Sequence, residues 1–63
     1  MFSAMVDDVI KKIAADRNID FVQGREIFDN IIDMIQDFPL DADSIVQENI
    51  GIKLNEFYEI LEQ

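Results

Sequence analysis

The stretch that decides the fold is residues 20–39, DFVQGREIFDNIIDMIQDFP. Asp20, with Gln23 three residues later, forms the capping-box pattern that begins a helix. Pro39 ends the helix, because proline disfavours helical geometry in the residue before it. Between these signals, apolar residues recur at three- and four-residue spacings: Ile27, Phe28, Ile31, Ile32, Met34, Ile35 and Phe38. The pattern predicts a helix that is capped by Asp20 and runs through Phe38.

The apolar face of this helix is wide. Its seven residues cover more than half of the circumference, which is more than packing against one neighbour requires. We therefore expect a central helix that touches two neighbours or a second copy of the chain. Gly24, near its start, costs about 1 kcal/mol relative to alanine. The usual reason to tolerate such a glycine is a close helix crossing.

Three shorter segments complete the pattern. Helices are predicted from about Ser3 to Asp16, from about Asp41 or Asp43 to Asn49, and from about Leu54 to Glu62, with Gly51 breaking the chain between the last two. The sequence thus predicts an all-α fold, a small compact bundle of three to four helices in a single helical domain over residues 1–63. The predicted core consists of Val6, Ile10, Ile13, Phe28, Ile31, Ile32, Ile35, Ile45, Val46, Ile50, Leu54, Phe57 and Leu61.

Residues 44–61, SIVQENIGIKLNEFYEIL, resemble a helix-turn-helix unit. Gly51 occupies the turn position that requires a positive φ angle. Gln47 stands where the family prefers a small residue. The resemblance implies a C-terminal helical hairpin whose inward-facing residues are Val46, Ile50, Ile52, Phe57, Ile60 and Leu61.

DNA binding, the function that this resemblance implies, conflicts with the charge of the hairpin. A recognition helix presents basic and amide side chains to bases and phosphates. The exposed positions here are Asn55, Glu56, Glu59, Glu62 and Gln63, with Lys53 at the entrance. We do not expect direct nucleic-acid binding, but a DNA-binding regulator stays as an alternative, in which phosphates would be contacted by Lys53, Asn55, Lys11, Lys12, Arg17 and Arg25.

The net charge of -9 arises entirely from the second part of the chain. Residues 1–25 carry four acids and four bases, whereas residues 26–63 carry ten acids against Lys53 alone. A field of this sign repels nucleic acids and anionic membranes and attracts basic protein surfaces. The preferred partner is therefore a basic protein surface, and a nucleic-acid-binding protein is the specific version of that hypothesis.

Asp29, Asp33 and Asp37 form a row on the predicted central helix, with Glu26 beside it. Their four-residue spacing places the carboxylates roughly 6 Å apart along the axis. This separation is close to that of successive phosphates on a nucleic-acid strand, so the row can act as a phosphate surrogate. The predicted partner-binding residues are Glu26, Asp29, Asp33, Asp37, Glu56 and Glu59. The alternative is a solvated face that keeps a small hydrophobic protein soluble.

The chain contains few of the side chains that most often serve as catalytic nucleophiles or general bases. Histidine and cysteine are absent, and the two serines, Ser3 and Ser44, are better explained as helix caps. The acids Asp37, Asp41, Asp43 and Glu48 follow part of the EF-hand spacing, but Pro39 and Ala42 replace a ligand and the required glycine. Capping by Asp41, Asp43 or Ser44, the last with Gln47, explains these residues more simply. We expect no enzyme activity, no catalytic residue, no cofactor and no metal site.

No apolar stretch approaches the roughly 20 residues of a membrane span, so we expect a cytoplasmic protein without membrane contact. Its size and acidity suit a viral or mobile-element protein. A homo-oligomeric scaffold, for example a homodimer, is a further alternative. It would be held by the apolar surface around Ile27 and Met34, with Tyr58 at the rim.

Overall fold

A computed structural model describes the backbone of residues 2–62 and the side chains of residues 6–62. In that part of the chain every regular element is helical, so the all-α prediction is confirmed. The elements are α1 (Phe2–Arg17), α2 (Phe21–Asp37), the 3-10 turn η1 (Pro39–Asp41), α3 (Ala42–Asn49) and α4 (Leu54–Glu62).

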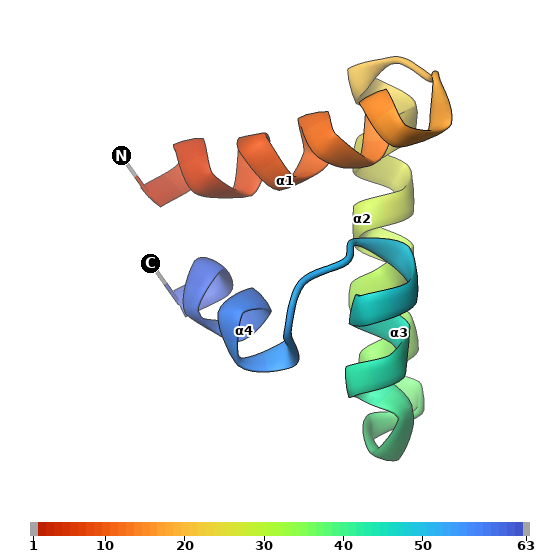
Figure 1. The fold of residues 1–63 in the computed structure, drawn as a ribbon, viewed down its shortest axis with the longest axis vertical. Coiled ribbons are helices and arrows are strands. Elements are labelled where there is room, and N and C mark those ends of the chain that lie inside the picture. The colour runs from red at the N-terminus through yellow and green to blue at the C-terminus, as the bar shows by residue number, and fades with distance from the viewer. Residues whose placement is uncertain (1, 63) are drawn as a thin grey trace.

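The helix α2 is central, as its wide apolar face predicts. It packs against α1 and α3, while α4 packs against α3 and α1. In Figure 1, α3 runs alongside α2, whereas α1 and α4 extend to the same side of that pair. The Cα radius of gyration is 11.0 Å, close to the value of about 10.6 Å expected for a compact chain of this length.

Local signals fix both ends of α2. The Gln23 backbone N–H donates to Asp20 Oδ1 at 2.8 Å, and the Asp20 N–H donates to Gln23 Oε1 at 3.4 Å. This is the predicted capping box. At the other end the helix stops at Asp37, one residue earlier than predicted, and the Phe38 N–H still donates to the Met34 carbonyl at 2.8 Å.

A close helix crossing, the usual reason for such a glycine, is present at Gly24, and α1 makes it. A Cβ atom at Gly24 would lie 3.0 Å from the Ile10 carbonyl oxygen and 3.1 Å from the Ala14 Cβ. Both distances are shorter than ordinary van der Waals contact. The absence of a side chain therefore lets the backbones of α1 and α2 approach each other, and this closeness also buries Ala14, which the predicted core omitted.

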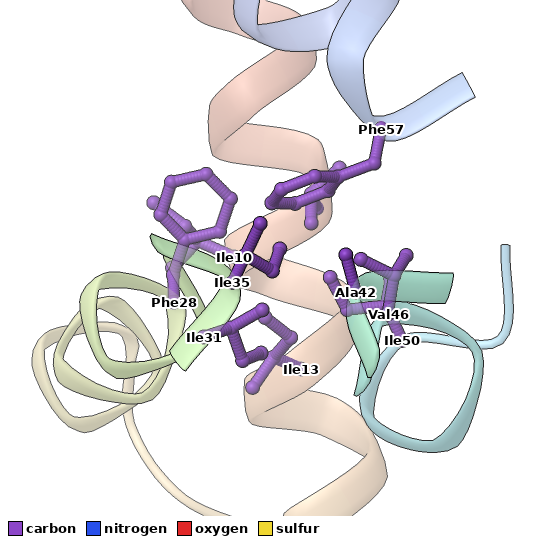
Figure 2. Close-up of a cluster of buried hydrophobic side chains, with 10 residues drawn as sticks. Ile10, Ile13, Phe28, Ile31, Ile35, Ala42, Val46, Ile50 and Phe57 are labelled. Carbon is purple, nitrogen blue, oxygen red and sulfur yellow. The ribbon is translucent and has the colours of Figure 1, made fainter. Parts of the chain in front are cut away.

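The core draws side chains from all four helices. Figure 2 shows Ile10 and Ile13 of α1, Ile31 of α2 and Val46 of α3 converging on a common centre. Phe57 of α4 is fully buried there, and its ring centroid lies 5.8 Å from that of Phe28 in a tilted arrangement. Such aromatic pairs contribute about 0.5–1.5 kcal/mol beyond the area that they bury.

The prediction that Leu61 belongs to the core is wrong. Leu61 is 37% exposed, because it lines an open apolar pocket beside the end of α2, whereas its neighbour Ile60 packs against the core. Val6, Ile32, Ile45 and Leu54 pack against the core but are only partly buried. The prediction also omitted Val9 and Ala42, which are buried.

The start of α3 differs from the predicted caps. Asp41 occupies the N-cap position, but its side chain makes no capping hydrogen bond, and Asp43 and Ser44 lie inside the helix. The reason is the 3-10 turn, which feeds directly into α3. The Ala42 N–H donates to the Pro39 carbonyl, so a backbone group replaces the expected side-chain cap.

Arg17 ties the end of α1 to the end of α3. Its guanidinium donates to the Asn49 carbonyl at 3.4 Å and to Asn49 Oδ1 at 3.3 Å. The Asn49 Nδ2 group in turn donates to the Ile45 carbonyl at 2.8 Å. A cation at the C-terminal end of a helix also interacts favourably with the helix dipole. This contact therefore holds the first helix against the C-terminal hairpin.

The hairpin turns at Gly51, as predicted. Gly51 has a φ angle of +83°, a conformation that only glycine adopts without strain. Its N–H donates to the Gln47 carbonyl at 3.0 Å and closes the C-terminal end of α3.

Replacing Gly24 tests the helix crossing. We expect Gly24→Val to lower the free energy of unfolding by about 1–3 kcal/mol, because the added atoms force α1 and α2 apart. Asn30→Val, at an exposed position of the same helix, is the control and should change stability by less than about 0.5 kcal/mol. Urea denaturation followed by circular dichroism measures both, and equal effects would contradict the crossing.

Replacing Arg17 tests the contact between α1 and α3. Arg17→Ala should lower the free energy of unfolding by about 1 kcal/mol, since the Asn49 carbonyl loses a charged donor. Arg25→Ala removes an exposed arginine from α2 and should cost less than about 0.5 kcal/mol. The same denaturation experiment compares them, and a larger cost for Arg25→Ala would refute the assignment.

Candidate protein-binding surface

The acidic row consists of Asp29, Asp33 and Asp37, and all three side chains are exposed on α2. At about 100° per residue, Asp33 lies about 160° around the helix axis from both Ile31 and Ile35. Those two residues are buried in the core. The row therefore occupies the side of α2 that is opposite the core, and Glu26 is exposed on the same helix.

Arg25 is the one base on α2, and the other four lie on α1 or just before α4. Among the side chains of residues 6–62, the ion pair is Lys12–Asp16, at 3.0 Å on α1. Arg25 lies one turn before Asp29, so the part of the row farthest from a base on α2 is Asp33 and Asp37. The last turn of α2 contains no base, so Asp37 also opposes the helix dipole.

The two α4 glutamates do not extend the row. Their predicted contribution required α2 and α4 to pack side by side, but α4 makes its main helix contacts with α3 and α1. Glu56 lines a shallow hollow with Asp8 and Lys12 of α1. Glu59 is exposed, about 160° around the α4 axis from the buried Phe57. The predicted binding residues thus divide between two separate surfaces.

Sequence reasoning missed an apolar pocket of about 240 Å³ between the end of α2 and α4. We call it the α2–α4 pocket. Tyr58 and Leu61 form its α4 wall and are 42% and 37% exposed. The spacing of these two residues on a short amphipathic helix is the available signal, but the sequence prediction places Leu61 in the core and Tyr58 at the rim of the self-association surface. The other lining residues are Ile32, Ile35, Gln36, Pro39 and Phe57.

Two of the basic residues that the DNA-binding alternative requires are engaged within the protein. Arg17 holds the end of α3, and Lys12 pairs with Asp16. Lys53 lies at the start of α4, where it lines a hollow together with Asp43 and Asn55.

The apolar surface proposed for self-association exposes less of Ile27 and Met34 than the sequence prediction assumes. Ile27 packs partly buried against the core, and Met34 is 36% exposed. Met34 lies about 160° around the α2 axis from both Ile32 and Gln36, which line the pocket with Tyr58. Tyr58 is therefore next to the opposite flank of α2 and does not rim the surface around Met34.

Neither a metal centre nor a membrane span is found among the described residues. Within residues 2–62, no three acidic side chains gather in a way that could hold a metal ion. None of the helices in this range combines the length and apolar character needed to cross a bilayer.

Neutralising the row tests whether it destabilises α2. Like charges one turn apart cost about 0.2–0.5 kcal/mol per pair, and the row contains two such pairs. The triple variant Asp29→Asn, Asp33→Asn, Asp37→Asn should therefore raise the free energy of unfolding by about 0.4–1 kcal/mol. The control, Asp7→Asn, Asp8→Asn, Glu48→Gln, removes the same charge from α1 and α3. Urea denaturation at low and at high salt measures both, and a gain that is equal in the control or insensitive to salt would contradict a local repulsion.

Comparisons with known proteins found no relative of this chain. The chain matches no protein-family model, no curated protein and no solved structure. The function of the acidic row must therefore be inferred from its own geometry and charge.

Proposed function

We propose that this protein is a non-enzymatic binding module that uses the acidic row of α2 to hold a basic surface of another protein. The single observation that supports this proposal is the placement of three exposed carboxylates in one line, opposite the buried side of α2. The specific form of the proposal is an inhibitor or regulator that occupies the nucleic-acid-binding surface of its partner.

In this proposal Asp29, Asp33 and Asp37 replace successive phosphates. Each carboxylate accepts hydrogen bonds from lysine or arginine side chains of the partner, and such charge-assisted bonds are stronger than neutral ones. The spacing of roughly 6 Å follows from the helix itself, because four residues rise by that distance. A basic groove that accommodates a nucleic-acid strand therefore meets negative charges at similar intervals.

The rigidity of α2 supports this role. The capping box fixes the first residue of α2, and the crossing at Gly24 sets the distance between the backbones of α2 and α1. Ile31 and Ile35 are buried on the inner side of the helix. Carboxylates on such a helix lose little conformational freedom on binding, which removes part of the usual cost of association.

Glu56 and Glu59 have a different role in this proposal, since they lie apart from the row. They add to the net charge of -9 and hence to the long-range field that steers a basic partner toward the protein. We assign them to the rate of association rather than to the bound contact.

A charge-reversal experiment tests the proposal. Wild-type protein, the variant Asp29→Lys, Asp33→Lys, Asp37→Lys, and the control Asp7→Lys, Asp8→Lys, Glu48→Lys are used to capture partners from a nuclease-treated lysate. Both variants change the net charge from -9 to -3, so only the position of the charge differs. We expect wild type and control to capture the same nucleic-acid-binding protein and the row variant to miss it. Elution should occur between about 0.15 and 0.5 M salt, since exposed charges are screened within about 8 Å at physiological ionic strength.

Three outcomes would overturn the proposal. Capture of the same proteins by all three forms would reduce the row to a solvated face. Direct binding of duplex DNA that is lost in Lys53→Glu would favour the DNA-binding alternative. A dimer in light scattering that dissociates in Ile27→Glu, without any captured partner, would favour the oligomeric scaffold.

A further inference from the structure

The α2–α4 pocket lies directly beside the acidic row. Ile32 and Gln36 line the pocket, and residues three or four apart on a helix are surface neighbours. Asp29 is three residues before Ile32, and Asp33 is three residues before Gln36. The α2 wall of the pocket and the row are therefore adjacent strips of one helix.

The pocket is large enough for a side chain of a partner. Its volume of about 240 Å³ exceeds the roughly 150 Å³ of an engineered cavity that binds benzene. Its rim is apolar where Tyr58 and Leu61 are partly exposed, and Leu40, next to the lining residue Pro39, is 99% exposed. Glu62 is exposed one turn after Tyr58 and supplies an acid on the α4 side.

We propose that the pocket and the row form one composite docking site for a basic amphipathic helix. An aromatic or leucine side chain of that helix enters the pocket, while its lysine and arginine residues contact Asp33 and Asp37. This proposal rests on the proposed function and specifies the chemistry of the partner. The geometry favours a helix, because basic residues four apart on a partner helix repeat at roughly 6 Å, the same interval as the row.

Charge argues against an occupant formed by residues 26–63 of a second copy of this chain. Residues 26–63, which contain the row and both walls of the pocket, carry ten acids and one base. A second copy that brought this region into the pocket would place carboxylates against carboxylates, which is destabilising. A partner segment rich in lysine and arginine has the complementary charge.

A selection from random peptides tests the chemistry that the site prefers. A displayed library of random 16-residue peptides is selected on the wild-type protein and counter-selected on Leu61→Gln. We expect the enriched peptides to carry several basic residues at three- and four-residue spacings and one large apolar residue. Enrichment of neutral or acidic peptides, or no enrichment, would overturn the proposal.

Variants then separate the two halves of the site, with fluorescence anisotropy of an enriched, labelled peptide as the measurement. Leu61→Gln and Tyr58→Gln should each weaken binding about tenfold, because they remove apolar contact. Asp33→Asn, Asp37→Asn should weaken it about fivefold at low salt. The control Asp7→Asn, Glu48→Gln removes two charges elsewhere and should leave affinity within about twofold. Circular dichroism verifies that each variant keeps its helix content.

The outcomes distinguish this proposal from the proposed function. If affinity depends on Asp33 and Asp37 but not on Tyr58 or Leu61, the acidic row binds basic surfaces and the composite site is wrong. If affinity depends on the pocket residues and is insensitive to charge and salt, both proposals fail. Amide chemical-shift changes confined to α2 and α4 would support the site, and changes confined to α1 and α3 would refute it.

Discussion

The approach of α1 to α2 at Gly24 is the constraint on which the rest of the structure depends. With a Cβ position only 3.0 Å from the Ile10 carbonyl, the two backbones are close enough for Ile10 and Ile13 to reach the same centre as Ile31. The hairpin formed by α3 and α4 then closes over that centre with Val46 and Phe57. A chain of 63 residues has little apolar surface to spare, so a wider crossing would leave a void that no other element could fill.

The central helix combines two opposed requirements. Its inner side is apolar and buried, and it places Phe28 and Ile31 in the core. Its outer side aligns like charges, an arrangement that opposes helix formation locally and ends with Asp37 at the unfavourable end of the dipole. Local conflicts of this kind concentrate at functional surfaces. The stability of α2 therefore comes from tertiary packing, which leaves its outer surface available for a different purpose.

Beyond the fold class and the central position of α2, the features that the sequence predicted correctly are local ones. The capping box at Asp20, the stop before Pro39 and the positive φ angle at Gly51 depend on a few neighbouring residues, so the pattern was sufficient. The exposure of Leu61 and the neighbours of α4 depend on where a short helix docks, which periodicity does not encode. For the same reason the row was found from its spacing, whereas the α2–α4 pocket was not. The binding roles of the acidic residues stay predictions.

The Arg17–Asn49 contact bears on whether the C-terminal helices can be exchanged between two copies of the chain. Small helical proteins can exchange a terminal element between two copies when the hinge before it opens. Here the hinge would be the turn at Gly51. The Arg17 guanidinium donates hydrogen bonds to Asn49, which lies immediately before that turn. Because Arg17 belongs to α1, these hydrogen bonds join the start of the hinge to the first helix of the same chain. An exchange of α3 together with α4 would break this contact, so the contact keeps α3 in its own molecule and confines any hinge to residues 50–53.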